Sequence, residues 1–285
     1  HHVTPQIKKG LPSHPGVFSS FSRNEFLDAI RSGIDYVHAG DCFQVNLAQR
    51  LLVPASMHPL DLYGRLRRCN PAPFAGLLDL GEEMILSASP ERFLRVNEGQ
   101  VFTRPIKGTR PRGIDPEEDA RLARDLQNSV KDRAENVMIV DLLRNDLGRV
   151  CSFGSVRVGS LCQLESFQTV HHLVSEITGS LRPGMTPLDL LKAAFPGGSV
   201  TGAPKIRAMQ IIAELEPVVR GAYCGSLGYI SCDGKMDTNI LIRSFTHSGG
   251  WFQFPVGGGI VADSVPEAEY AETFHKAAGL LRALD

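Results

Sequence analysis

The sequence lacks several features that define common classes of protein. Its 30 basic and 31 acidic residues leave a formal net charge of −1, so no excess of charge favours nucleic acid or an anionic membrane surface as a partner. We expect no signal peptide, and the sequence contains no apolar run near the ~20 residues that span a bilayer. With 42% hydrophobic residues, the composition is that of an ordinary soluble enzyme with a substantial core.

Cysteine is scarce and unpatterned. The six cysteines, at positions 42, 69, 151, 162, 224 and 232, form no CxxC pair and no spacing typical of a secreted disulfide scaffold. We therefore expect free thiols in a reducing, cytoplasmic compartment. None of them stands in a GxCxG turn, so the sequence contains no glutaminase nucleophile.

The 285 residues contain no repeat, no low-complexity linker and no shift in composition that would divide them. The first residues are rich in proline, glycine and serine. We predict a loose lead-in over residues 1–17 and one domain over residues 18–285.

Helical and strand-like patterns occur in mixed order. Helices are predicted over residues 22–39, 61–69, 115–148 with a break near 128, 187–194, 204–214 and 264–281. Strands are predicted over residues 43–53, 74–80, 84–88, 100–103, 156–164, 169–179, 223–231, 236–246 and 251–255. Ser22 and Ser264, each with a glutamate three residues on, are expected N-caps in capping boxes. The mixed order predicts an α+β fold with a large antiparallel component.

Lys107 is the first candidate for chemistry. It lies between Arg104 and Arg110, in a segment rich in turn residues that follows the short strand at 100–103. Neighbouring cations disfavour the ammonium form of a lysine and favour the free amine, which is the nucleophilic form. A solvated basic loop would account for the same residues.

Two pairs of carboxylates have helical spacing. Asp132 and Glu135 are three residues apart, as are Glu269 and Glu272, so each pair shares one face of its predicted helix. If the two helices face each other, four carboxylates converge without a nearby Cys or His, and Mg²⁺ is the natural occupant of such a site. Two solvated helix faces are the alternative. Lys276, one turn after Glu272, could serve an anionic ligand.

Glycine-rich segments and isolated polar residues add weaker candidates. Residues 197–205 fail the phosphate-loop template, but backbone N–H groups at the start of the following helix can hold a carboxylate. Residues 257–259 are three glycines, which allow close approach of a ligand or form a plain turn. Arg243 suits a carboxylate, Glu91 follows a strand, and His172 precedes an apolar run. A surface carboxylate and a core histidine remain alternatives for the last two.

Together these segments resemble the chorismate-utilising enzymes from about Phe18 onward. The resemblance is carried by Asp41–Leu47, Ser89–Arg92, Pro105–Arg110, Ala134–Asn136, Asp141–Asp146, His172–Ser175, Gly198–Met209, Gly257–Ser264 and Glu269–Lys276. It implies an anthranilate synthase-like fold, in which large, mixed, mostly antiparallel sheets pack as a sandwich with flanking helices, and it makes 18–285 a chorismate-binding catalytic domain.

Lys107 discriminates within that family. Anthranilate synthases carry alanine in the Pro-Ile-x-Gly-Thr motif, whereas lysine is characteristic of aminodeoxychorismate synthase component I. Gln44 stands where the isochorismate-forming and salicylate-forming members have a water-activating lysine, which argues against water as the nucleophile. The resemblance therefore implies a transferase that aminates chorismate for 4-aminobenzoate and folate synthesis.

The resemblance also implies roles for individual residues. Mg²⁺ would be held by Glu135 and Glu272, with Asp132 and Glu269 as outer partners. Lys107 would attack C2 of chorismate while Glu91 protonates the departing C4 hydroxyl, and His172 matches the position proposed for pyruvate elimination in anthranilate synthases. Substrate would be bound by Gln44, Thr109, Thr201, Tyr229, Arg243, Gly258, Gly259 and Lys276.

Two departures from the family bear on these expectations. The sequence is shorter than whole members, which have a further N-terminal portion, and Asp132 replaces a glutamate usual in the metal-flanking pair. Ammonia is expected from a glutamine amidotransferase subunit in a heterodimer, or from solution. The alternatives are anthranilate synthase component I, which would also release pyruvate, and an inactive fragment that binds a partner.

Overall fold

The computed structural model describes residues 9–167 and 170–285. The chain divides into two compact units. Unit 1 contains the residues up to Pro90 together with Val200–Leu227 and Asn239–Asp285, and unit 2 contains Glu91–Ser199 and Gly228–Thr238. Each unit is therefore built from separate stretches of sequence.

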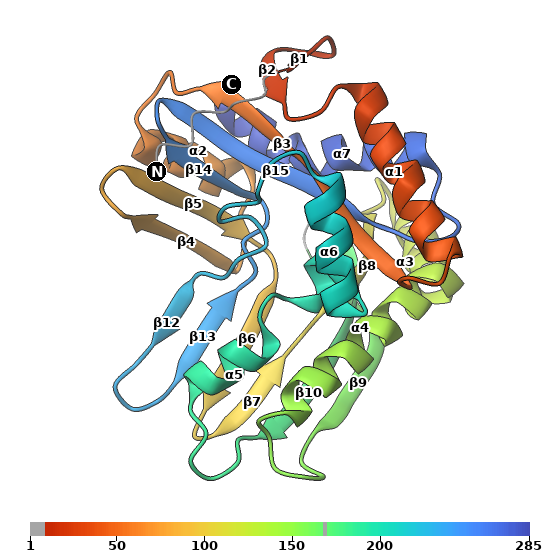
Figure 1. Cartoon of the computed structure of the whole chain (residues 1–285), viewed down its shortest axis with the longest axis vertical. Coiled ribbons are helices and arrows are strands. Elements are labelled where there is room, and N and C mark those ends of the chain that lie inside the picture. Colours follow the sequence, from red (N-terminus) through yellow and green to blue (C-terminus); the bar gives the residue numbers. More distant parts are fainter. Residues whose placement is uncertain (1–8, 168–169) are drawn as a thin grey trace. The chain divides into compact units, whose positions relative to one another are not determined.

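Unit 1 is built on an antiparallel sheet that, over the described residues, has eight strands. Their order is β1 (Lys9–Leu11), β2 (His14–Ser19), β3 (Gln44–Pro54), β15 (Trp251–Ile260), β14 (Ser244–Ser248), β5 (Glu83–Ser89) and β4 (Phe74–Asp79), with β11 (Gly202–Ala203) also paired to β3. The long strands β3 and β15 lie side by side (Figure 1), from Val45 opposite Ile260 to Pro54 opposite Trp251.

Four helices of unit 1 pack against this sheet. They are α1 (Arg23–His38), α2 (Pro59–Cys69), α6 (Lys205–Leu215) and α7 (Pro266–Leu284). One apolar cluster joins α2 and α7 to the sheet around Leu51, and a second joins α1 and α6 to it around Val45 and Leu47. Because side chains alternate along a strand, Gln44 and Asn46 lie on the opposite face of β3 from these apolar residues.

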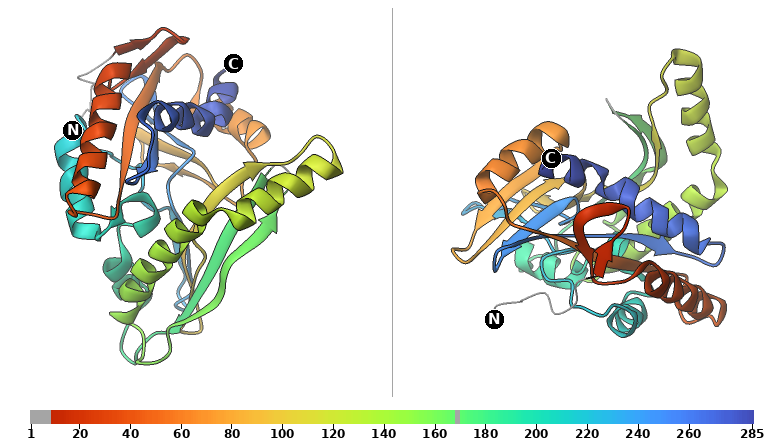
Figure 2. Two further views of the ribbon diagram at one scale, coloured as in Figure 1. Left: turned by 90° about the vertical axis from the view of Figure 1, so that its right-hand side faces the viewer. Right: turned by 90° about the horizontal axis from the view of Figure 1, so that it is seen from above.

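Unit 2 has its own antiparallel sheet. The strand order is β12 (Gly228–Ile230), β13 (Met236–Asn239), β6 (Arg92–Asn97), β7 (Gln100–Thr103), β10 (Val170–Ser180) and β8 (Ile106–Pro111), with β9 (Arg157–Ser166) also paired to β10. The helical elements are α3 (Pro116–Asn128), α4 (Val130–Gly148), α5 (Pro187–Ala194) and η1 (Gly198–Val200). Figure 2 shows α4 lying along β9 and β10, which buries Ile139, Val140 and Leu143.

The predicted α+β class with antiparallel sheets is confirmed, and several local predictions hold. Ser22 caps α1 in a capping box with Glu25. The expected break near residue 128 falls at Ser129, which ends α3 and caps α4. The predicted pair of strands at 74–80 and 84–88 is β4 with β5.

Other expectations were wrong. Of the predicted lead-in, the part from residue 9 onward forms β1 and most of β2, and residues 1–8 lie outside the described residues, as does Thr169 at the start of a predicted strand. The strand expected over 223–231 is confined to β12. The strand expected over 236–246 is interrupted around Arg243, whose φ of 53° is left-handed.

Ser264 is not the N-cap of the last helix. The N-cap of α7 is Val265, which makes no side-chain capping bond. The Ser264 hydroxyl instead accepts from the Val261 N–H at 3.1 Å and donates to Glu269 Oε1 at 2.7 Å. Among the described helices, none combines the length and apolar character needed to cross a bilayer.

Candidate functional site

Lys107 lies in β8, not in a turn as the sequence suggested. Strand β8 pairs with β10, with Lys107 opposite Leu173 and Thr109 opposite His172. The register shifts at this point because Gly108 is an extra residue in β8, and its φ is +81°, which glycine adopts without strain. The bulge therefore lies directly between Lys107 and Thr109.

Gly108 also lies close to helices α3 and α4. A Cβ atom at this position would lie 2.9 Å from Leu126 Cδ1 and 3.0 Å from Asp132 Cβ. Any larger residue would separate α4 from the strand. The glycine thus keeps the carboxylates of α4 beside Lys107.

Each cation of this segment has a carboxylate partner. Lys107 Nζ lies 3.7 Å from Glu135 Oε2, with the lysine side chain only 14% exposed. Arg110 donates to Asp132 Oδ2 at 3.0 Å, and Arg104 pairs with Glu165 and Glu176. The flanking arginines are therefore neutralised, and Glu135 is the charged group that the structure places next to Lys107.

Thr109 and His172 form a second contact across the same pair of strands. The distance from Thr109 Oγ1 to His172 Nδ1 is 2.9 Å. The Phe167 ring lies against the imidazole, with 5.6 Å between the ring centroids. The region of unit 2 where β8, β10 and α4 meet thus contains five of the candidate residues: Lys107, Thr109, Asp132, Glu135 and His172.

Glu91 and Tyr229 lie elsewhere in unit 2. Glu91 directly precedes β6 and is buried, although it is a carboxylate. Tyr229 is on β12 opposite Asp237, and it is 62% exposed. Within unit 2 neither residue is brought next to Lys107 by a contact that the structure records.

Gln44 is the most unusual polar residue of unit 1. It is fully buried in β3, and within the described part of the chain both atoms of its side-chain amide lack a hydrogen-bond partner. Asn46, two residues on and therefore on the same face, has a buried Nδ2 in the same condition. Buried amides without partners are costly, so this face of β3 suits a polar ligand.

The three glycines belong to β15, so the alternative of a plain turn was wrong. A Cβ at Gly259 would lie 2.0 Å from Gln44 Nε2, and one at Gly257 would lie 2.4 Å from the Leu47 carbonyl oxygen. A Cβ at Gly258 would lie 3.3 Å from Glu269 Oε2, 3.6 Å from Lys276 Nζ and 4.0 Å from Glu272 Oε1. The glycines therefore open β15 toward Gln44 on one face and toward the charged residues of α7 on the other.

The charged residues of α7 contact one another and the glycine backbone. Lys276 Nζ lies 2.5 Å from Glu272 Oε1 and donates to the Gly257 carbonyl at 3.0 Å. Glu269 is 7% exposed and accepts the hydrogen bond from Ser264. The sequence predicted the shared face of these residues, but the contact with Gly257 needed the fold.

Thr201 and Arg243 complete the candidates in unit 1. Thr201 is buried and its carbonyl accepts from the Asn46 N–H at 2.8 Å, which ties it to β3. The left-handed backbone of Arg243 is a conformation that a non-glycine residue keeps only where its surroundings require it. Its carbonyl accepts from the Ala88 N–H at 3.1 Å.

The carboxylates fit Mg²⁺ in their ligand chemistry. Each unit supplies two of them, one helical turn apart, and Mg²⁺ prefers oxygen ligands. In neither unit, over the residues described, do three or more His, Cys, Asp or Glu side chains gather into one metal-binding group. Each pair by itself therefore provides two ligands.

Sequence reasoning missed two polar residues that hold this region together. Asn136 donates to the Leu173 carbonyl at 3.2 Å and accepts from the Ser175 hydroxyl at 2.5 Å, which fixes α4 to β10. Arg110 holds the first turn of α4 through Asp132. An asparagine directly after Glu135 in the predicted helix was the available signal for the first of these.

Comparisons with known proteins define the class. The family model described as chorismate binding enzyme matches residues 2–282. The chain therefore belongs to the chorismate-binding enzyme family.

Its relatives include two kinds of synthase. It is 51% identical over 288 residues to anthranilate synthase component 1 of Thermus thermophilus, covering 98% of this chain and 62% of the relative. It is 53% identical over 267 residues to aminodeoxychorismate synthase component 1 of Salmonella typhimurium, covering 94% and 59%. The chain thus spans about three fifths of the length of these relatives.

A solved structure supports the fold. The crystal structure of anthranilate synthase component I from Streptococcus pneumoniae TIGR4 matches with a TM-score of 0.85 and 39% identity, covering 96% of this chain and 60% of that chain. The anthranilate synthase-like fold expected from the sequence is confirmed.

Proposed function

We propose that the protein is an aminodeoxychorismate synthase component I, which uses Mg²⁺ and ammonia to convert chorismate to 4-amino-4-deoxychorismate for 4-aminobenzoate and folate synthesis. The observation that carries the proposal is Lys107 itself. It is a largely buried amine on β8, two residues from the Thr109–His172 contact and beside Glu135. A primary amine at this position provides a nucleophile that an alanine cannot.

In the proposed reaction, Lys107 acts as the nucleophile and Glu91 as the acid. Lys107 Nζ forms a bond to C2 and loses a proton, while both ring double bonds shift toward C4 and the C4–oxygen bond breaks. Glu91 protonates the departing oxygen, which leaves as water. Ammonia then forms a bond to C4 and loses a proton, both ring double bonds shift back, the C2–nitrogen bond breaks, and Lys107 recovers its proton.

Two sets of residues would hold the substrate. The partnerless amide of Gln44, together with Thr201 and the backbone of Gly258 and Gly259, suits polar groups of chorismate. Arg243, Lys276, Thr109 and Tyr229 complete the proposed binding residues, with Arg243 and Lys276 suited to carboxylates. His172 is proposed to assist in orienting the ring.

The carboxylate pairs are the proposed Mg²⁺ ligands. Glu135 and Glu272 would bind the ion, and Asp132 and Glu269 would act as outer or water-mediated partners. When bound, Mg²⁺ would withdraw electron density from the chorismate ring through the carboxylate of that ring. The name "component 1" of the relatives supports a partner subunit, for which we propose a glutamine amidotransferase that supplies ammonia.

Anthranilate synthase component I is the second candidate. It is favoured by the relative of that name at 51% identity and by the presence of His172. Both candidates use chorismate, Mg²⁺ and ammonia, but only anthranilate synthase releases pyruvate and a fluorescent aromatic product.

Product identification separates the two. The protein is incubated with chorismate, Mg²⁺ and ammonium, and the products are identified by mass spectrometry with a coupled assay for pyruvate. The proposal predicts 4-amino-4-deoxychorismate without pyruvate. Anthranilate and equimolar pyruvate would establish the second candidate instead.

A further inference from the structure

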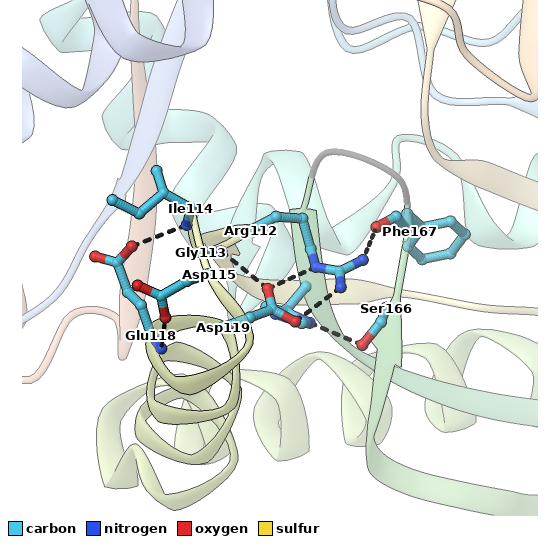
Figure 3. A network of polar contacts seen from close by, with 9 residues as sticks. Arg112, Gly113, Ile114, Asp115, Glu118, Asp119, Ser166 and Phe167 are labelled. Atoms are coloured by element: carbon cyan, nitrogen blue, oxygen red, sulfur yellow. Dashed lines mark hydrogen bonds and ion pairs between the residues drawn. The ribbon is translucent and has the colours of Figure 1, made fainter.

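A network of polar contacts joins three elements of unit 2 outside the proposed catalytic residues (Figure 3). Arg112, just after β8, donates from Nε and Nη2 to the two carboxylate oxygens of Asp119 at 2.7 Å each. The Gly113 N–H donates to Asp119 Oδ1 at 2.9 Å. Arg112 Nη1 also donates to the Phe167 carbonyl at 2.8 Å. The end of β8 is thereby joined to α3 and to the residue that follows β9.

His171 completes this network from β10. It is 2% exposed, with Nε2 3.0 Å from Asp119 Oδ1 and Nδ1 2.8 Å from Ser166 Oγ. The Arg112 guanidinium, then the Gly113 amide and more weakly His171, hold the pKa of Asp119 well below its usual value. Asp119 is therefore ionised and can only accept, so Nε2 carries a proton, and in the neutral ring Nδ1 accepts from the Ser166 hydroxyl. We call Arg112, Asp119, Ser166 and His171 the Asp119 clasp.

The Asp119 clasp reaches His172 by two routes. The first is β10, where His171 and His172 are neighbours whose side chains alternate between faces, opposite Arg110 and Thr109 of β8. The second is Phe167, whose carbonyl is held by Arg112 and whose ring lies against the imidazole of His172. Two groups that contact His172, the Thr109 hydroxyl and the Phe167 ring, are thus attached to segments that the clasp fixes.

Strand β8 needs such an attachment. Among the described strands it pairs only with β10, and the bulge at Gly108 interrupts that pairing beside Thr109. A bulged edge strand has weak intrinsic register, so contacts at its end determine where its side chains lie.

The clasp has the residue types of a catalytic triad in Ser166, His171 and Asp119. Its geometry, however, favours a structural role. Both oxygens of Asp119 are bound by the Arg112 fork, and His171 is buried between its two partners. These contacts restrain the histidine rather than leave it available for proton transfer to a substrate.

We propose that the Asp119 clasp is a positioning device for His172, with Asp119 and His171 as positioning residues that hold the Thr109 and Phe167 contacts in place. The catalytic consequence rests on the proposed function of the site. In the Asp119→Asn variant the amide cannot accept from both Arg112 and His171 as the carboxylate does, so the orientation of His172 is loosened while its chemistry is retained.

Steady-state kinetics test the consequence for turnover. Asp119→Asn is expected to lower kcat for chorismate about 10-fold with little change in KM, as is typical when a residue that orients a functional group is altered. Asp119→Glu, which keeps the two acceptor oxygens, is expected to recover part of the loss. Asp125→Asn is the matched control, because Asp125 is an exposed residue of α3 that pairs only locally with Arg121 in the recorded ion pairs. Its kcat is expected to equal that of the unmodified protein.

A double variant separates positioning from general destabilisation. If the clasp acts through His172, Asp119→Asn has no further effect on kcat in a His172→Gln background. If it only supports the fold, the two losses in kcat multiply, and that result would overturn the proposal.

A measurement without turnover makes the test independent of the proposed function. The ring ¹⁵N signals of His172 are compared by NMR in the unmodified protein, Asp119→Asn and Asp125→Asn, all without substrate. We expect a shift of the His172 signals in Asp119→Asn alone. Unchanged His172 signals in that variant would refute positioning, whereas shifted signals in a protein that fails to aminate chorismate would refute the proposed function only.

Discussion

The helices α4 and α7 each carry two carboxylates three residues apart, yet the groups around them differ. On α4, Asp132 and Glu135 face Arg110 and Lys107 of the adjacent strand β8. On α7, Glu269 accepts from Ser264 before the helix, and Glu272 pairs with Lys276 of the same helix. Pairs with identical spacing therefore have different surroundings. The pair on α4 lies beside the proposed nucleophile Lys107, and the pair on α7 lies beside the glycine backbone of β15.

The difference assigns separate tasks to the two pairs. The pair on α4 lies close against β8, since a Cβ atom at Gly108 would lie 3.0 Å from Asp132 Cβ. The pair on α7 lies beside Gly258, where the absence of a side chain leaves room for a ligand. Four substitutions test this division.

Lys107→Ala should have the largest effect. It removes the proposed nucleophile while leaving β8 paired with β10, so amination should fall on the order of 10³-fold or more with the fold retained. The rate is measured by mass spectrometry of the product, with circular dichroism as the check on folding. Lys192→Ala, an exposed lysine of α5, is the control and should keep its full rate. A Lys107→Ala rate within a few-fold of the unmodified protein would remove the nucleophile from the mechanism.

Glu272→Gln should raise the Mg²⁺ concentration needed for half-maximal rate. Loss of one charged oxygen ligand weakens metal binding, by roughly 10–100-fold if the effect matches other changes around metal sites. The measurement is the rate as a function of Mg²⁺. Glu267→Gln, in the exposed first turn of the same helix, should leave that curve unchanged. Equal Mg²⁺ curves for both variants would show that the pair on α7 does not bind the ion.

Gly258→Ala should impair activity with little loss of stability. The new methyl group would lie 3.3 Å from Glu269 Oε2 and 3.6 Å from Lys276 Nζ, so it occupies the space next to the charged groups. We expect roughly a 10-fold decrease in kcat/KM for chorismate, as follows from a small misplacement of binding groups. Gly10→Ala, which meets nothing within 4 Å, is the matched control. A fully active Gly258→Ala variant would exclude a role for that space.

Ser264→Ala should lower the free energy of unfolding more than Ser129→Ala, which removes a helix N-cap. Glu269 is buried and would lose a donor, so the free energy of unfolding should decrease by about 1–3 kcal/mol. Ser129→Ala, which removes the N-cap of α4, should cost about 1 kcal/mol. Urea unfolding at constant m-value measures both. A smaller loss for Ser264→Ala than for Ser129→Ala would show that Glu269 is satisfied by other groups.

Local signals in the sequence were sufficient for some elements. The capping box of Ser22 with Glu25 and the break at Ser129 depend on residues within one helical turn, so sequence patterns predicted them correctly. For Ser264 the same pattern misled, because its hydroxyl bonds Glu269, five residues on, and not Glu267. The three glycines were likewise ambiguous, because the residues that Gly257 and Gly259 approach belong to β3, about 200 residues earlier, and those that Gly258 approaches belong to α7.

The sequence supplied the candidate residues of the site, but not the contacts between them. Shared helical faces gave both carboxylate pairs, and the motif around Lys107 gave the candidate nucleophile. Nothing local indicated that residues 106–111 form an edge strand, since the paired residues of β10 lie 59 to 68 positions later and a glycine bulge breaks the pattern of β8. The Glu135 contact of Lys107 depends on that pairing, and so it could not be predicted.

The most direct test of Lys107 as the nucleophile is peptide mass spectrometry of the protein mixed with chorismate and Mg²⁺ in the absence of ammonia. Under these conditions the covalent intermediate cannot be released by amination. The proposed mechanism predicts a chorismate-derived mass increase, with loss of one water, on the peptide that contains Lys107, and no such increase in Lys107→Ala. Amination of chorismate by a protein whose Lys107 peptide never carries this mass, even in rapid-quench samples, would contradict it.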